Sequence, residues 1–145
     1  MEISVLISDD LATAIDIRRK VFIEEQKVPE ELEIDEYDYD GVTQHVLALD
    51  QDGRAVGTAR FRPYGEGKLK IERVAVLAQS RGCDIGSKMM SFIEAEALKN
   101  GYLALKLEAQ VHARSFYERR GFLGHGAIFL DAGIEHITME KQLFG

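Results

Sequence analysis

The sequence predicts an α+β fold, with a mixed and mostly antiparallel sheet that contains one central parallel pair and is flanked by helices. Three strand-like runs follow one another directly in the middle of the chain, which predicts antiparallel hairpins. A helix, a strand and a second helix then alternate, which predicts one local parallel pair. The 145 residues, 46% hydrophobic and 30% charged, suit a globular protein, so we expect a single domain over residues 1–145.

The first half of the chain begins with a strand and a helix. Alternating Ile3, Val5 and Ile7 predict the strand. Ser8-Asp9-Asp10 can cap a helix that runs to about Gln26, and Pro29 ends it. The three strands that follow are expected at Gln44 to Leu49, Ala55 to Phe61, and Leu69 to Val76, with a turn signal at Asp52-Gly53 between the first two.

The second half begins with a helix expected from Ile85 to Asn100, because apolar residues recur there every four positions. Asn100-Gly101 ends this helix, and alternating leucines from Leu103 to Leu107 predict a strand. A short helix from His112 to Arg120 and strands at Ala127 to Leu130 and Ile137 to Gln142 complete the predicted order.

Composition limits which partners and which cellular compartment we expect for this protein. The net charge is −7, yet nine acidic residues and one lysine lie between Glu24 and Asp40, so the rest of the chain is nearly neutral. This acidic segment favours a cationic partner or substrate, and the alternative is a solvated loop that aids solubility. We expect no nucleic-acid partner and no membrane association, because no basic face or long apolar run stands out. A single cysteine and the absence of a signal-peptide pattern suit the cytoplasm, and we expect no metal.

The most informative stretch is a turn where the third central strand leads into a helix. Its small residues let the backbone approach a ligand, and the free N–H groups at a helix N-terminus attract anions, above all a pyrophosphate. The alternative is a structural strand-to-helix turn. The residues of this turn are Arg81, Gly82, Cys83, Asp84, Ile85, Gly86, Ser87 and Lys88.

This stretch resembles the signature of the GNAT N-acetyltransferases, Arg/Gln-x-x-Gly-x-Gly/Ala, here Arg81-Gly82-Cys83-Asp84-Ile85-Gly86. Asp84 stands where the family pattern usually has its first glycine. The resemblance extends over nearly the whole chain. Within the family, the chain is similar to one subgroup of small bacterial members. The motifs that carry it are Arg18 to Gln26 with Val28-Pro29, Glu72 to Val76, Glu108 to His112, Phe116 to Phe122, and Gly133 to Met139.

The resemblance implies acetyl-CoA as the co-substrate and assigns roles to several residues. Backbone groups of Val74, Ala75 and Val76 would pair with the pantetheine arm, and an N–H near Val76 would stabilise the oxyanion. The turn from Arg81 to Lys88 would bind the pyrophosphate, with His112 near the cofactor. Tyr117 would face the departing sulfur; its alternative is a core aromatic.

An amine acceptor also needs a base, because its ammonium form does not react. Glu72, beside the expected thioester position, is the first choice, and its alternative is a salt bridge within the sheet. His45, His112 and His136 are further candidates. Cys83, as an acetyl-carrying nucleophile at a helix N-terminus, is a less favoured route.

The sequence therefore predicts an enzyme that transfers an acetyl group from acetyl-CoA to an amine by direct attack in a ternary complex. Alternatives are a catalytically silent acyl-CoA-binding regulatory module and an interaction domain without a ligand. The acceptor, a small-molecule or peptide amine, is not identified, and the resemblance also admits a homodimer.

Overall fold

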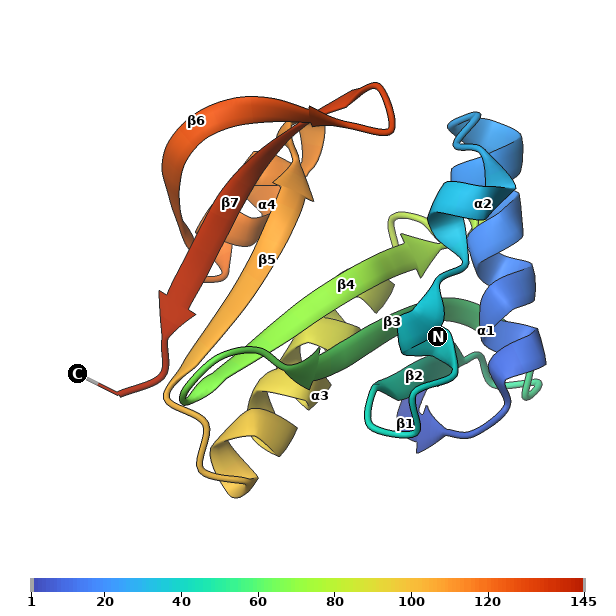
Figure 1. Cartoon of the computed structure of the whole chain (residues 1–145). Helices are drawn as coiled ribbons and strands as arrows, with labels where there is room; N and C mark the ends of the chain where they lie inside the picture. Colours follow the sequence, from blue (N-terminus) through green and yellow to red (C-terminus); the bar gives the residue numbers. More distant parts are fainter. Residues whose placement is uncertain (1, 145) are drawn as a thin grey trace.

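The computed structural model describes residues 2–144, in which one mixed sheet of seven strands runs through the molecule (Figure 1). The strand order is β1-β2-β3-β4-β5-β7-β6, and the β4–β5 pair is parallel while its neighbours are antiparallel. The strands are β1 (Ser4–Ser8), β2 (Gln44–Leu49), β3 (Ala55–Pro63), β4 (Lys68–Val76), β5 (Ala104–Gln110), β6 (Leu123–Asp131) and β7 (Ile134–Gln142). The predicted α+β fold with one central parallel pair is confirmed.

Helices cover both faces of the sheet. On one face α1 (Leu11–Arg18) packs over β2, β3 and β4, and on the other α3 (Ile85–Lys99) packs over β1 to β4. Alternate residues of β2 enter the two cores, with Leu47 facing α1 and its neighbours Val46 and Ala48 facing α3. The short helix α4 (Arg114–Arg119) joins the α3 core through Tyr117. Covered on both faces, the central strands are buried almost continuously, which explains their strong sequence signal.

One glycine sets how closely α3 approaches the sheet. A Cβ atom at Gly57 of β3 would lie 3.0 Å from Ile85 and 3.1 Å from Met89. Both of these side chains are buried, so neither can move aside easily. Gly57 therefore lets the N-terminal turn of α3 sit directly beside the end of β4.

The segment after α1 differs from the expected continuous α-helix. Asp10 caps α1 as predicted, since its carboxylate accepts the Thr13 N–H at 3.1 Å. From Arg19 to Glu25, however, the helix widens into a π-helix (η1). Shorter turns follow as α2 (Glu30–Glu33) and η2 (Glu36–Asp38). A π-helix adds a residue to each turn, and such segments often lie at functional sites.

Strands β4 and β5 separate after four paired positions. Their parallel pairing runs from Lys68 opposite Ala104 to Ile71 opposite Leu107 and then stops. Just beyond, Arg73 has a φ of 57°, and the register between β3 and β4 shifts, which marks a bulge. A bulge bends its strand and increases the local twist, so β4 turns away from β5. Figure 1 shows the two strands meeting at one end and diverging at the other.

None of the helices within residues 2–144 is long and apolar enough to cross a membrane.

Candidate active site

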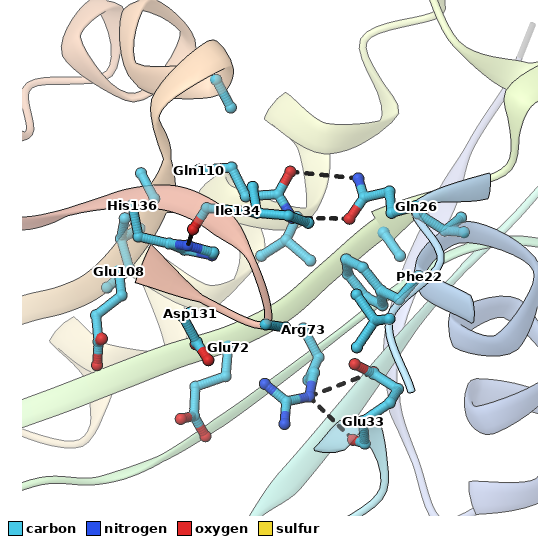
Figure 2. Close-up of a pocket in the computed structure, with 18 of the residues that line it drawn as sticks. Phe22, Gln26, Glu33, Glu72, Arg73, Glu108, Gln110, Asp131, Ile134 and His136 are labelled. Atoms are coloured by element: carbon cyan, nitrogen blue, oxygen red, sulfur yellow. Dashed lines mark hydrogen bonds and ion pairs between the residues drawn. The ribbon is translucent and has the colours of Figure 1, made fainter. Parts of the chain in front are cut away.

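A cavity of about 410 Å³ opens where β4 and β5 diverge. Its walls come from η1 and α2 on one side, the separated ends of β4 and β5, the short turn η4 (Val111–Ala113) with α4, and the β6–β7 hairpin. Figure 2 shows Phe22 and Gln26 facing Ile134 and His136 across this space. The widened turns of η1 place Val21 and Phe22 in the wall, so the unexpected π-helix contributes directly to the cavity.

The β4 wall is an unpaired strand edge. Past Ile71, β4 continues to Val76 and pairs with β3 alone among the described strands. Val74, Ala75 and Val76 line the cavity from this edge, and the family resemblance implies that they pair with the pantetheine arm. Unpaired backbone N–H and C=O groups suit an extended chain that carries amides. That role stays a prediction, but the three residues lie together on a free edge as it requires.

The turn between β4 and α3 is a cradle of free N–H groups. Within residues 2–144, the backbone N–H groups of residues 82–87 make no hydrogen bond to another group. The first bond at this end of α3 runs from Lys88 N–H to the Asp84 carbonyl, at 3.0 Å. A run of six free donors at a helix N-terminus suits an anion such as a pyrophosphate, and the exposed Lys88 adds a positive charge.

Asp84 sits at the N-cap position of α3 in an unusual conformation. Its φ is 59° and its ψ is 22°, in the left-handed region that favours glycine. Its side chain forms no capping hydrogen bond with any described residue of α3. The Asp84 side chain therefore does not cap α3. The family pattern has a glycine at this position, and the backbone conformation supplies a physical reason for that preference.

Arg81 is already occupied by protein groups. Its guanidinium donates two hydrogen bonds to the Glu25 carboxylate, both at 2.9 Å, and one to the Val76 carbonyl at 3.1 Å. The hydrogen bond from Arg81 holds the pKa of Glu25 below its usual value. Arg81 thus ties the end of η1 to the end of β4. Its assignment to a pyrophosphate stays a prediction, and it would require Arg81 to leave Glu25.

Tyr117 of α4 lines the cavity from a buried position. It is 8% exposed and packs edge-on against Phe116 and Phe122, with ring centroids 5.0 and 5.8 Å away. Its hydroxyl has no hydrogen-bond partner among residues 2–144, and burial raises the pKa of Tyr117 to about 12. A thiol ionises near pH 8.5, so protonation of a thiolate by this phenol is uphill by roughly 5 kcal/mol. Tyr117 is therefore suited to donate a hydrogen bond rather than a proton.

Glu72 of β4 also lines the cavity, but three cations surround it. Its carboxylate lies 3.0 Å from Arg62, 3.2 Å from Arg60 and 3.4 Å from Lys70. Burial alone would raise its pKa, but the hydrogen bond from Arg62 and the charges of Arg60 and Lys70 lower the pKa of Glu72 to about 2. Moving a proton from an ammonium of pKa about 10.4 to this carboxylate is uphill by roughly 11 kcal/mol. Glu72 forms the salt bridge within the sheet that the sequence left open, and its environment makes it a weak base.

The acidic segment from Glu24 to Asp40 is partly folded into the protein. Arg18, 1% exposed, binds Glu33 at 2.9 Å and Asp38 at 2.6 Å. Arg60, also 1% exposed, binds Asp35 at 2.7 Å and Asp38 at 3.0 Å. The segment is therefore not a purely solvated loop. It is also not a surface on which every carboxylate is free to attract a cationic substrate. These carboxylates instead attach α2 and η2 to α1 and β3.

The remaining candidates differ in their access to the cavity. His112 and His136 line it, whereas His45 and Cys83 are not among its lining residues. Cys83 packs partly buried against the α3 core, and that position gives no support to a nucleophilic role. His45 is buried on β2, and burial lowers its pKa. Among the described residues, no group of three or more His, Cys, Asp or Glu side chains is arranged to hold a metal ion.

A pair of glutamines spans the cavity, and the sequence analysis missed it. The Gln26 amide donates to the Gln110 oxygen at 3.2 Å, and the Gln110 amide donates back at 2.8 Å (Figure 2). His112 Nε2 lies 2.6 Å from the same Gln110 oxygen. The two glutamines are 84 positions apart, so local periodicity could not reveal the contact. This bridge links η1 to the end of β5 across the opening.

Comparisons with known proteins give the class that the fold and the cavity suggest, an acyltransferase. The family model described as the acetyltransferase (GNAT) domain matches residues 10–143. The Bacillus subtilis acetyltransferase BSU40680 is 40% identical over 134 residues, which cover 92% of this chain and 90% of the relative. The uncharacterized N-acetyltransferase YjcF of the same organism is 36% identical over 135 residues, covering 92% and 94%.

Solved structures of acyltransferases also match this chain. An acyl-CoA N-acyltransferase from Pseudomonas aeruginosa matches with a TM-score of 0.86 and 27% identity, over 97% of this chain and 99% of that one. An N-acetyltransferase structure from Lactobacillus plantarum matches with a TM-score of 0.91 over 99% of this chain and 100% of that one, and at 23% identity it shows the fold. The chain belongs to the GNAT acetyltransferase family, and it is an acyltransferase of the kind that uses acyl-CoA.

Proposed function

We propose that this chain transfers an acetyl group from acetyl-CoA to an amine by direct attack within a ternary complex. The observation that carries the proposal is one cavity lined by both the free edge of β4 and Tyr117, whose hydroxyl has no described partner. The run of free N–H groups before α3 begins directly after Arg81, which also lines this cavity. The names of the relatives in Bacillus subtilis support acetyl as the acyl group and nitrogen as the acceptor atom.

Each feature suits one part of the acyl donor. The edge from Val74 to Val76 would bind the pantetheine amides, and residues 82–87 would bind the pyrophosphate through their N–H groups. A backbone N–H near Val76 would donate to the thioester oxygen as it gains negative charge. The Tyr117 hydroxyl, free of protein partners among the described residues, would donate to the sulfur as the C–S bond breaks.

The acceptor would enter from the side of the cavity formed by η1, α2 and the β6–β7 hairpin. Carboxylates of Glu72, Glu108 and Asp131 gather on this side, as Figure 2 shows. Glu72 is neutralised by its three cations, and Glu108 lies 2.8 Å from Lys70. An amine with a pKa near 10.4 loses its proton at pH 7 at a cost of about 4.6 kcal/mol, so the reaction gains from a base.

A silent acyl-CoA-binding module is the second candidate. The observations that favour it are the occupied Arg81 and the carboxylate of Asp84 within the phosphate cradle. Both would weaken binding of the pyrophosphate and leave the protein as a sensor of abundant acyl-CoA. Such a module would bind acetyl-CoA yet release no free CoA.

The experiment that separates the two candidates is a screen of amine acceptors that reads release of free CoA from acetyl-CoA. A thermal-shift titration with acetyl-CoA accompanies it. The proposal predicts both a shift and amine-dependent CoA release. A shift without release for any acceptor would favour the silent module, and neither signal would favour an interaction domain without a ligand.

A further inference from the structure

The four histidines differ in what their ring nitrogens contact. Both nitrogens of His45 are enclosed by protein and lack a hydrogen-bond partner among residues 2–144. His112 Nε2 contacts Gln110 at 2.6 Å, and the exposed His125 contacts Glu140 at 3.1 Å. His136 alone both lines the cavity and keeps Nε2 free of any described partner.

The backbone fixes which nitrogen of His136 carries the proton. Its Nδ1 lies 2.7 Å from the carbonyl oxygen of Ile134. A carbonyl only accepts hydrogen bonds, so Nδ1 must be the donor, and the lone pair of the neutral ring resides on Nε2. Nε2 is not among the fully enclosed polar atoms that lack a partner, so it keeps some accessible surface, and His136 itself lines the cavity.

The ring is also held in place. His136 of β7 is registered opposite Phe129 of β6, and the two rings stack with centroids 5.9 Å apart and planes at 26°. On its other side β7 pairs with β5, where His136 is opposite Gln110 at the open end of the sheet. With 9% of its surface exposed, the ring has little freedom to turn away. A base that is oriented in advance loses little entropy when it meets its proton.

His136 lies on the acceptor side of the cavity. Figure 2 shows it above Glu108 and Asp131, across from Phe22 and Gln26. The charged or titratable groups that share this cavity are Glu33 of α2, Glu72 and Arg73 of β4, Arg81, Glu108 of β5, His112 of η4, Tyr117 of α4 and Asp131 of β6. Among the carboxylates, Glu33 and Glu72 are held by arginines and Glu108 by Lys70, so these three are committed to ion pairs. Asp131, at the end of β6, has no ion-pair partner among the described residues.

We propose that Nε2 of His136 is the base that deprotonates the acceptor amine. The inference rests on the proposed function and names the group that the transfer requires. The ammonium gives one proton to Nε2, and the nitrogen lone pair then forms the C–N bond at the thioester carbon. The C–S bond breaks, and the second nitrogen proton passes to the leaving thiolate directly or through water. His136 returns its proton to solvent, so one proton is released for each amide and free CoA formed.

The first test compares His136→Gln with the control His125→Gln, which removes a histidine of β6 that lies outside the cavity lining. Acetyl-CoA turnover is measured with ethylamine and with the much less basic 2,2,2-trifluoroethylamine across a pH range. We expect kcat/KM for ethylamine to fall about a hundredfold or more in His136→Gln, with acetyl-CoA affinity within about twofold of the wild type. The loss should be much smaller for trifluoroethylamine, and free imidazole should restore activity to His136→Ala.

A merely structural role for His136 would lower the rates with both amines equally, and imidazole would restore nothing. Equal rates and pH profiles in the wild type and His136→Gln would also overturn the assignment. If the wild type acetylates no amine, the proposed function fails, and nitrogen NMR of the imidazole decides the remaining point. The assignment requires a proton on Nδ1 and none on Nε2 in the neutral ring, and the opposite tautomer would contradict it.

Discussion

Replacing Asp84 by glycine and by asparagine separates the conformational effect of this residue from its charge. Asp84 has a left-handed backbone with a φ of 59°, and its side chain caps no described helix residue. Its carboxylate belongs to the same turn as the free N–H groups of residues 82–87. Glycine removes both the strain and the charge. Asparagine removes the charge and tolerates the left-handed region nearly as well as aspartate does.

The effect of the left-handed backbone at Asp84 on the free energy of unfolding is small. A left-handed residue with a side chain costs roughly 1–2 kcal/mol, whereas glycine adds about 0.5–1 kcal/mol of backbone entropy to the unfolded chain. Asp84→Gly should therefore stabilise the protein by about 1 kcal/mol or less, with no cap lost to offset the gain. Asp84→Asn should leave the free energy of unfolding nearly unchanged.

The electrostatic part should appear in the affinity for acetyl-CoA. We take a separation of roughly 5 Å between the carboxylate and a phosphate held by these N–H groups, a distance that ordinary hydrogen-bond lengths allow. Repulsion at that distance costs about 0.8 kcal/mol in water and about 3 kcal/mol at an effective dielectric of 20. Both variants should therefore bind acetyl-CoA between about fourfold and a hundredfold more tightly than the wild type.

Calorimetric titration at two salt concentrations measures the affinities, and urea unfolding measures stability. The gain in affinity should shrink at high salt, because exposed charges are screened. Lys27→Gly provides a matched control, since Lys27 is exposed, has a φ of 62° and lies outside the turn before α3. Wild-type affinity in both Asp84 variants would show that the pyrophosphate does not bind at this turn.

Three further substitutions test other parts of the site. Tyr117→Phe should lower kcat about tenfold to a thousandfold in steady-state assays while leaving acetyl-CoA affinity unchanged, and an unaltered kcat would return Tyr117 to a packing role. Because the pKa of Glu72 is lowered from 4.5 to about 2, its charge stabilises the fold above about pH 4.5, and this contribution is lost as pH falls towards 2. In urea unfolding, Glu72→Gln should be less stable than the wild type at pH 7, by an amount on the order of 3 kcal/mol, and the difference should vanish at acidic pH; a pH-independent difference would contradict this. Arg18→Met removes the shortest ion pair of both Glu33 and Asp38, leaving Arg73 beside Glu33 and Arg60 beside Asp38, and should cost about 3–5 kcal/mol in thermal unfolding. A loss below about 1 kcal/mol would show that the cluster is not structural.

Much of the sheet was predictable because its central strands bury both faces. The range Gln44–Leu49 matches the prediction, and β3 and β4 differ from it by two residues or fewer. Strand β6 runs from Leu123 to Asp131, longer than the predicted Ala127 to Leu130. Leu123 is 75% exposed and Leu130 is 71% exposed, so this edge strand lacks the alternation that marks a half-buried one.

The features of the site that depend on local sequence could be predicted. The features that depend on contacts between residues far apart in the chain could not. The turn from Arg81 to Lys88 was readable because small residues stand between a strand and a helix. The ion pairs that lower the pKa of Glu72 come from side chains whose directions depend on strand register, so its weak basicity was not visible. The Gln26–Gln110 bridge likewise depends on the divergence of β4 and β5. The hydrogen bond that orients His136 is local, but the stacking that holds the ring requires the β6–β7 hairpin.

The most direct test of the account is to quantify both products of one reaction. The purified protein is incubated with acetyl-CoA and an amine from the acceptor screen, and mass spectrometry measures acetylated amine and free CoA over time. The account predicts that the two products appear in equal amounts from the first turnover, with no acetylated protein, and that Tyr117→Phe slows both equally. Free CoA in excess of acetylated amine, or an acetyl group retained on Cys83, would contradict direct transfer in the cavity between β4 and β5.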